Sequence, residues 1–248
     1  MKLLVIVLCL LSERFLIHSI SLQRFSWFKD YANVITQKTG SNPYFSNSWL
    51  ILSALVLPIF VSVSFLYLLF NGVFFGFVGF LFSILIFYYC LGPQNPFYPI
   101  TADELNEQEN IGNYFVGVNS QLFTVIFWFI IAGPLAALLY RLLTMCKEQS
   151  TVSIQATLAV DVLEWFPARL TALMYLLVGN FQRGFGQFIR YVFSTPNLND
   201  KLLNECGLHA VQVNDSEDVP MPVAEMLVEH AAIVFLVFIA LFTLVAWM

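Results

Sequence analysis

The chain has 248 residues, of which 59% are hydrophobic and only 11% are charged, and its net charge is −5. Soluble domains usually carry about 25% charged residues. The interior of a soluble fold of this length is too small to bury so many apolar side chains. No basic run is present that would bind nucleic acid. We therefore predict an all-α, polytopic integral membrane helix bundle that forms one domain over residues 1–248.

Several apolar stretches are candidates to cross the bilayer, since a crossing helix needs about 20 mainly apolar residues. In chain order they are 1–17, 49–70, 73–91, 122–140, 158–178 and 231–248. We expect the first to stay attached as a helix because no small-x-small cleavage site follows its apolar run. The most soluble stretch, 195–222, is expected to be a loop.

Breaks within these stretches leave two alternatives open. The Asn71-Gly72 pair is a turn signal, so a tight hairpin is expected there, with one long bent helix as the alternative. The Gly133-Pro134 pair should kink its helix or permit close packing. The stretch 158–178 has too few uncharged residues in a row for a simple span, so it is expected to cross the bilayer, re-enter it, or lie against the other helices.

The charged residues of that last stretch are the first candidate site. Asp161 and Glu164 are three positions apart and share a helix face. Arg169 lies about 80° round the helix from Asp161. Each charge at bilayer depth costs roughly 2.5–3.5 kcal/mol, so none is expected to face lipid. The three residues are predicted to form either a ligand pocket or a mutually neutralised cluster that orients the helix.

Further charges lie at the ends of two other apolar stretches. Glu13 and Arg14 end the first stretch, where they are expected to form an interfacial pair or part of a polar cluster. Arg141 follows Tyr140, marks the end of the fourth stretch and is a further candidate for the ligand-binding or structural polar cluster. We expect no metal or cofactor, because the three histidines are scattered and no nucleotide-binding motif is present. The four cysteines are expected to be buried free thiols.

Two groups of residues carry a family resemblance. The segment 161–173, DVLEWFPARLTAL, resembles the Pro-Ala-Arg-Leu-Thr-Ala signature of the membrane cobinamide-phosphate synthases of cobalamin assembly, the CbiB/CobD type. Three short sequences are similar to the preceding helix of that superfamily, namely FW at 127–128, GP at 133–134 and LLYR at 138–141. The segment 89–94, YCLGPQ, is more similar to its AmpE branch, described as an inner-membrane signalling protein linked to β-lactamase induction. Together these similarities cover roughly residues 85–180.

The departures from the synthase pattern decide between the two branches. The synthase branch usually carries a Glu-Asn-x-x-Asp cluster before the Phe-Trp helix, and its positions here are Val116, Gly117 and Ser120. It also carries an Asn-Thr-Leu-Asp run where this chain has Thr144 to Lys147. An ATP-dependent amide synthetase needs acidic groups to hold magnesium and phosphates. The resemblance therefore implies a retained scaffold without the catalytic carboxylates, and it favours a regulatory protein over an enzyme.

Three functions follow as expectations. The first is a regulatory protein of the AmpE type, multi-pass in the bacterial cytoplasmic (inner) membrane, whose partners besides the lipid bilayer would be a small polar ligand or a membrane protein. The second is an amide ligase like the cobinamide-phosphate synthases. The third is a transporter component, suggested by Pro167 within the charged stretch 158–178. In the first two, Asp161 and Arg169 would have a structural or ligand-holding role.

Overall fold

The computed structural model describes residues 2–15, 25–40, 47–71, 76–91, 107–212 and 219–245, and these contain helices and no strand. The predicted all-α fold is therefore confirmed for the described residues. The chain divides into two compact units, each made of discontinuous segments. Unit 1 comprises Met1–Pro93 and Val125–Val162, and unit 2 comprises Gln94–Thr124 and Leu163–Met248.

Among the described residues, three helical stretches are long and apolar enough to cross a membrane, namely Ser48–Phe70, Ile111–Ala132 and Met221–Thr243. Two shorter apolar helices, Phe77–Cys90 and Pro134–Cys146, accompany them. Their length and composition fit a membrane protein, since a crossing helix needs about 20 apolar residues. The single membrane domain and the set of six crossing segments stay predictions.

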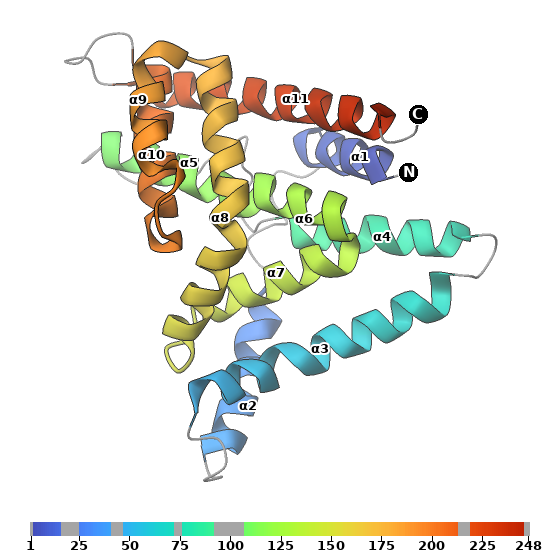
Figure 1. The fold of residues 1–248 in the computed structure, drawn as a ribbon. Helices are drawn as coiled ribbons and strands as arrows, with labels where there is room; N and C mark the ends of the chain where they lie inside the picture. The colour runs from blue at the N-terminus through green and yellow to red at the C-terminus, as the bar shows by residue number, and fades with distance from the viewer. Residues whose placement is uncertain are drawn as a thin grey trace. The chain divides into compact units, whose positions relative to one another are not determined.

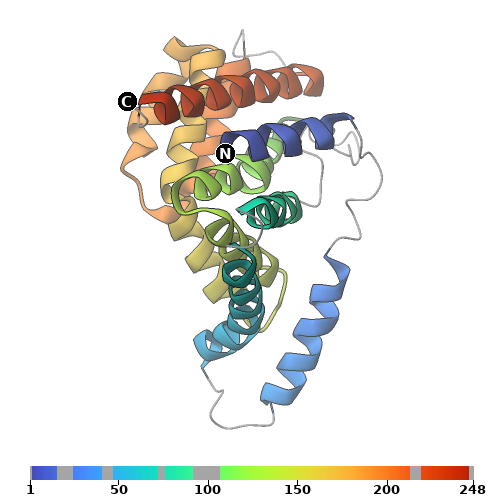
Figure 2. The same ribbon diagram turned by 90° about the vertical axis from the view of Figure 1, so that its right-hand side faces the viewer.

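Unit 1 is built from apolar helices that pack on one another. Its helices are α1 (Lys2–Phe15), α2 (Ser26–Gly40), α3 (Ser48–Asn71), α4 (Phe77–Cys90), most of α6 (Thr124–Ala132), α7 (Pro134–Cys146) and the first part of α8 (Ser153–Val178) (Figure 1). Helix α7 packs against both α3 and α4, while α1 packs on α4 and α2 packs on α3. Figure 2 shows α2 standing beside α3 in this unit. Side-chain hydrogen bonds in this unit join the end of α4 to the start of α2 and to α7.

The described residues between 48 and 90 form two helices. Helix α3 ends at Asn71, and α4 begins at Phe77 after Gly76, which has a left-handed φ of 85°. Glycine adopts this conformation without the steric penalty of a Cβ atom. The two helices pack against each other, as a hairpin requires. Residues 72–75, which include the rest of the expected turn, lie outside the described residues.

A break at Gly133 replaces the expected kink, so the prediction of one helix over 122–140 is wrong. Gly133 has φ 87° and ψ −172°, a region open almost only to glycine. Pro134 then begins α7 at a position where its missing N–H costs nothing. The preceding helix instead runs without interruption to Ala132 through α5 (Glu107–Val118), the π-helical turn η4 (Asn119–Phe123) and α6.

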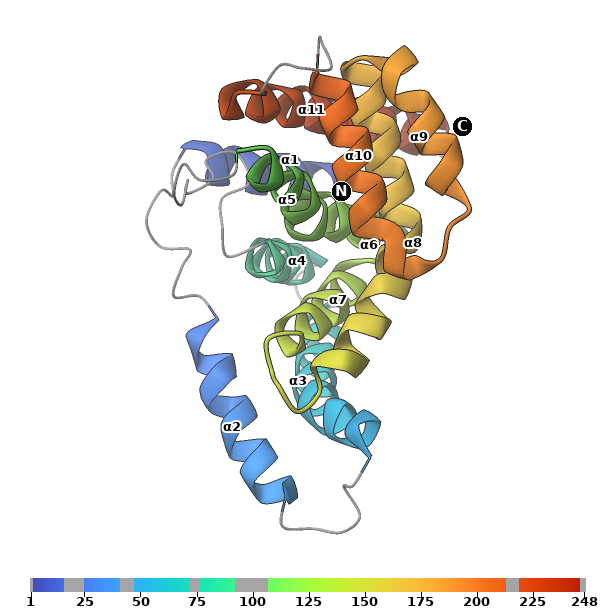
Figure 3. The same cartoon turned by 90° about the vertical axis from the view of Figure 1, so that its left-hand side faces the viewer.

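Unit 2 packs its helices around a polar helix. It contains α5, η4, the second part of α8, α9 (Phe181–Val192), the 3-10 turn η5 (Pro196–Leu198), α10 (Asn199–Val211) and α11 (Met221–Val245) (Figure 3). Helix α10 lies in the stretch 195–222 that was expected to be a loop. It packs against α5, α9 and α11. Its buried side is a narrow stripe of apolar and small residues, including Leu202, Leu203, Cys206, Gly207 and Ala210.

Close packing of α10 on α5 depends on glycine. A Cβ atom added at Gly207 would overlap the ring of Phe115, and one added at Gly112 would overlap the side chain of Asn204. Small residues at such positions let two helices approach closely.

The sequence prediction that the cysteines are buried free thiols is confirmed, because all four are free and buried.

Candidate functional site

Helix α8 carries the three charges that sequence analysis grouped together. Glu164 and Arg169 are buried, whereas Asp161 is half-buried. Asp161 and Glu164 each interact with other groups of the chain. Pro167 lies inside the helix without ending it. The stretch is therefore a continuous helix over its charged part, as expected, and none of the three charges lies on its exposed side.

Arg169 is directed at the segment that links α9 to α10. Its Nε donates to the carbonyl of Val192 at 2.8 Å, and its Nη2 donates to the carbonyl and the hydroxyl of Ser194 at 2.9 and 3.3 Å. Its Nη1 donates to Asn199 Oδ1 and to the carbonyl of Trp165, both at 2.6 Å. These five bonds equal the number of N–H groups that a guanidinium has. Arg169 thus binds neither Asp161 nor Glu164 among the described residues.

Trp165 completes this arrangement. Its indole lies under the guanidinium of Arg169, with 4.3 Å between the guanidinium carbon and the ring centroid. The indole Nε1 also donates to the Ser194 carbonyl at 2.9 Å. A buried arginine over tryptophan gains about 2 kcal/mol from this contact. Trp165 and Arg169, one helical turn apart, therefore fasten α8 to the α9–α10 connection.

A second polar connection joins α8 to the π-helical turn. Thr171 Oγ1 donates to Asn119 Oδ1 at 2.8 Å, and both residues are buried. One turn later, the Tyr175 hydroxyl donates to the Phe115 carbonyl at 3.3 Å. The π-turn itself is defined by the Thr124 N–H, which donates to the Asn119 carbonyl five positions back. Thr171 stands out in the sequence only as part of the Pro-Ala-Arg-Leu-Thr-Ala block. Asn119 was not predicted, because it belongs to no recognisable motif.

The Pro-Ala-Arg-Leu-Thr-Ala block at 167–172 therefore supplies two internal anchors. Arg169 and Thr171, its polar members, both make hydrogen bonds within unit 2. A reacting group must be able to meet a substrate, and these two side chains are committed to the protein itself. Within the described ranges, no three His, Cys, Asp or Glu side chains are grouped so that they could hold a metal ion.

Arg141 lies in unit 1 and has a comparable anchoring role. Its Nε donates to the carbonyl of Cys90, the last residue of α4, at 2.6 Å. The final carbonyls of a helix lack intrahelical partners, and a cation there also meets the negative end of the helix dipole. The guanidinium carbon lies 5.9 Å from the centroid of the Phe25 ring. Arg141 thus joins α7 to the end of α4 and to the residue before α2.

Aromatic side chains reinforce the same meeting point. Trp27 Nε1 donates to the Tyr89 hydroxyl at 2.6 Å, which joins the first turn of α2 to the last turn of α4. The rings of Phe25 and Tyr89 meet edge to face, with 5.2 Å between centroids. Such edge-to-face pairs contribute about 0.5–1.5 kcal/mol beyond their buried area.

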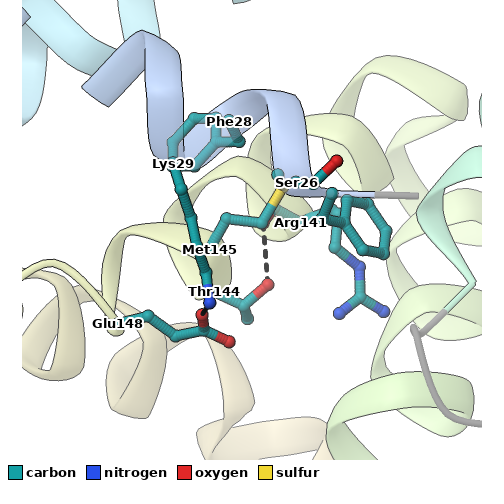
Figure 4. Close-up of a pocket in the computed structure, with 8 residues that line it drawn as sticks. Ser26, Phe28, Lys29, Arg141, Thr144, Met145 and Glu148 are labelled. Atoms are coloured by element: carbon teal, nitrogen blue, oxygen red, sulfur yellow. Dashed lines mark hydrogen bonds and ion pairs between the residues drawn. The ribbon is translucent and has the colours of Figure 1, made fainter. Parts of the chain in front are cut away.

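A cavity of about 230 Å³ opens between the start of α2 and the end of α7 (Figure 4). It is lined by Phe25, Ser26, Phe28, Lys29, Arg141, Thr144, Met145 and Glu148. Lys29 Nζ and Glu148 Oε2 form an ion pair of 3.0 Å, and both side chains are about two-thirds exposed. Figure 4 shows that the Arg141 guanidinium points away from this pair. The cavity thus offers an exposed pair of opposite charges beside aromatic and thioether groups.

Sequence analysis missed Lys29 and Glu148. The two residues are 119 positions apart, and neither belongs to an apolar stretch where a charge would stand out. Glu13 and Arg14, which it did select, fall in the last turns of α1, but their side chains lie outside the described residues. Among the selected residues, the structure places Arg141 at the cavity, and Asp161, Glu164 and Arg169 along α8.

A scan against models of known protein families finds no match, and searches of curated proteins and of solved structures return no significant match either. The resemblance of residues 161–173 to the synthase signature therefore stays a prediction, as does the branch to which the chain would belong.

Proposed function

We propose that this protein is a multi-pass regulatory protein of the AmpE type in the bacterial cytoplasmic membrane, which acts in β-lactamase induction without catalysing a reaction. The observation that carries the proposal is the state of Arg169. It is the one charged residue of the signature block, and all of its guanidinium N–H groups are used for acceptors within the protein. An arginine whose N–H groups are all bonded within the protein has a structural role, which supports a scaffold protein over an enzyme.

The positions that correspond to the Glu-Asn-x-x-Asp cluster of the synthases support the same proposal. Val116 and Gly117 lie on α5 and have no side-chain oxygen. Ser120 lies in η4, where its hydroxyl donates to the Gly117 carbonyl at 3.0 Å. In ATP-dependent ligases, carboxylates hold the magnesium ions, and these ions bind the phosphate groups. None of these three positions thus carries a carboxylate, and the Ser120 hydroxyl bonds to the backbone.

The cavity of unit 1 is the place where a small polar ligand would act in this proposal. Exposed ion pairs contribute only about 0–1 kcal/mol, so the Lys29–Glu148 pair is easily exchanged for a ligand that carries both charges. The Phe28 and Met145 side chains offer an apolar wall beside it. A regulatory protein that binds such a ligand needs no catalytic group.

The proposal is tested by deleting the gene in a bacterium that carries it and measuring inducible β-lactamase activity with several inducers. We expect the induction threshold to change, and a plasmid copy of the gene should restore it. Complementation with a Lys29→Glu, Glu148→Lys double variant tests whether the orientation of the pair matters, because it keeps the pair but reverses it. Unchanged induction for every inducer would contradict the proposal.

A second assay separates this proposal from the ligase alternative. The purified protein is incubated with ATP, magnesium, a corrinoid carboxylic acid and an amine, and ATP hydrolysis is followed. We expect no consumption above the background of a preparation from cells that lack the gene. Substrate-dependent ATP consumption would favour the ligase and would overturn the regulatory proposal.

A further inference from the structure

Helix α9 and the residue after it carry an exposed apolar stripe. Phe181, Phe185, Ile189 and Phe193 recur at every fourth position, and their side chains are 38%, 39%, 56% and 90% exposed. A four-residue spacing advances the stripe by about 40° each time, so it covers about 120° of the helix surface. The rings of Phe181 and Phe185 stack with 4.7 Å between centroids and leave the stripe continuous. Single exposed apolar residues are common, whereas a continuous stripe marks an interaction surface.

The same helix carries positive charge and no acidic residue. Its sequence, FQRGFGQFIRYV, contains Arg183 and Arg190. Arg190 is exposed and lies about 100° round the helix from Ile189. Arg183 donates to the carbonyl of Gln212 at 3.3 Å, which keeps its side chain beside the end of α10. Both charges therefore lie on the polar flank of the apolar stripe, where they complement a negatively charged surface.

The direction of α9 within unit 2 fits a helix that lies on a membrane. Helix α11 is apolar enough to cross a bilayer along its own axis. Figures 1 and 3 both show α9 running across the direction of α11. A helix that runs across a membrane-crossing helix lies parallel to the membrane surface. Amphipathic helices in this position bury their apolar face at the boundary of the headgroups and acyl chains and keep basic residues at the headgroups.

We propose that α9 is an interfacial helix whose stripe, Phe181, Phe185, Ile189 and Phe193, enters the bilayer surface while Arg183 and Arg190 bind the phosphate groups of anionic phospholipids. This inference goes beyond the proposed regulatory function and does not depend on it. A basic residue close to an anionic membrane surface gains about 1 kcal/mol, or about fivefold in partitioning. Lipid composition therefore tunes how deeply α9 is inserted.

The test uses the full-length protein reconstituted in phospholipid vesicles. A nitroxide spin label is attached to Ile189→Cys or, as the matched control, to Gln187→Cys on the other side of α9, and the signal of the unsubstituted chain is subtracted. Accessibility to oxygen, which partitions into lipid, is compared with accessibility to a water-soluble nickel chelate. We expect the label at 189 to collide mainly with oxygen and the label at 187 mainly with nickel.

Lipid composition supplies the second arm of the test. In vesicles that contain phosphatidylglycerol, the label at 189 should lie deeper than in vesicles of phosphatidylcholine alone, and Arg190→Gln should reduce that difference severalfold. Equal nickel accessibility at 189 and 187 would overturn the proposal. Dipolar broadening at 189 that disappears on dilution with unlabelled protein would also overturn it, because the stripe would then be covered by a second copy of the chain.

Discussion

Thr171 Oγ1 and Asn119 Oδ1 are 2.8 Å apart although the two residues are 52 positions apart in sequence, and neither side chain is accessible to solvent to any useful degree. Asn119 Nδ2 has no hydrogen-bond partner, and neither does the nearby Thr124 Oγ1. An unpartnered buried donor costs about 1–3 kcal/mol. Burial of Asn119 therefore costs free energy, and the bond to Thr171 offsets part of that cost. Asn119 lies where a π-turn interrupts the α-helix.

This arrangement predicts unequal effects for the two single substitutions. Thr171→Ala should destabilise the protein more than Asn119→Ala, because it leaves both polar groups of the amide without partners. In Asn119→Ala, the Thr171 hydroxyl can instead bond the carbonyl four residues back. Thermal unfolding of both variants and of the double variant in detergent measures the coupling, for which we expect about 1 kcal/mol. Strictly additive effects would show that the bond contributes nothing.

Arg169→Lys is predicted to be strongly destabilising although it keeps the charge. A lysine has no fork of N–H groups, so it cannot serve Val192, Ser194 and Asn199 together. Unpartnered buried acceptors should cost on the order of 3 kcal/mol, which lowers the unfolding midpoint by about 6–12 °C in a chain of this length. The matched control is Arg190→Lys on the surface of α9, which should leave the midpoint unchanged. Equal midpoints for the two variants would refute the anchoring role of Arg169.

The sequence predicts these anchors only in part. The cost of a charge in an apolar helix predicts that Arg169 must be sheltered, but it does not say by what. One of the two alternatives for this stretch was that Asp161 and Glu164 neutralise Arg169 within the same helix. The structure instead supplies backbone carbonyls from the segment after α9, together with Asn199. Such partners depend on how the chain returns to α8, and backbone carbonyls leave no trace in a sequence.

The helix boundaries show a similar limit. Apolar length predicts α3 almost to the residue, because no charged residue interrupts its run and Pro58 lies inside the helix without ending it. The conformation of Gly133 could not be read from a Gly-Pro pair, which is compatible with both a kink and a break. Helix α10 was missed because its average polarity is high while its buried stripe is narrow. Periodicity, and not mean hydropathy, carries the information in such a helix.

Gly207→Ala should separate α10 from α5. Its added methyl group would overlap the ring of Phe115, which is fully buried. Overpacking of this kind costs about 1–3 kcal/mol, so the unfolding midpoint should fall by several degrees. Gly186→Ala is the control, because no atom lies within 4 Å of its Cβ position, and alanine should favour the helix by up to about 1 kcal/mol. A stable Gly207→Ala protein would mean that α10 does not pack this closely.

The cavity residues of unit 1 are predicted to differ sharply in their effects on stability. Glu148→Gln breaks an exposed ion pair and should change the free energy of unfolding by less than about 1 kcal/mol. Arg141→Gln should cost about 2 kcal/mol, because it removes the donor to the Cys90 carbonyl inside the protein. Denaturant titration in detergent compares the two variants. A large effect of Glu148→Gln would indicate that the pair is structural, which would weaken its proposed role in ligand binding.

Cys206 should be unreactive in the folded protein, and it should make the free energy of unfolding depend on pH in the alkaline range. Burial, with a smaller contribution from Glu205, raises the pKa of the Cys206 thiol from 9.0 to about 12. At pH 7.5 a maleimide should therefore label it only after unfolding, whereas a cysteine introduced at the exposed Asn197 should react at once. Between pH 9 and 12 the unfolded chain releases a proton that the folded protein keeps, so the free energy of unfolding should fall as pH rises. Cys206→Ala should flatten that decline relative to the unsubstituted protein, and an unchanged slope would mean that the thiol has the same pKa in the folded and unfolded states.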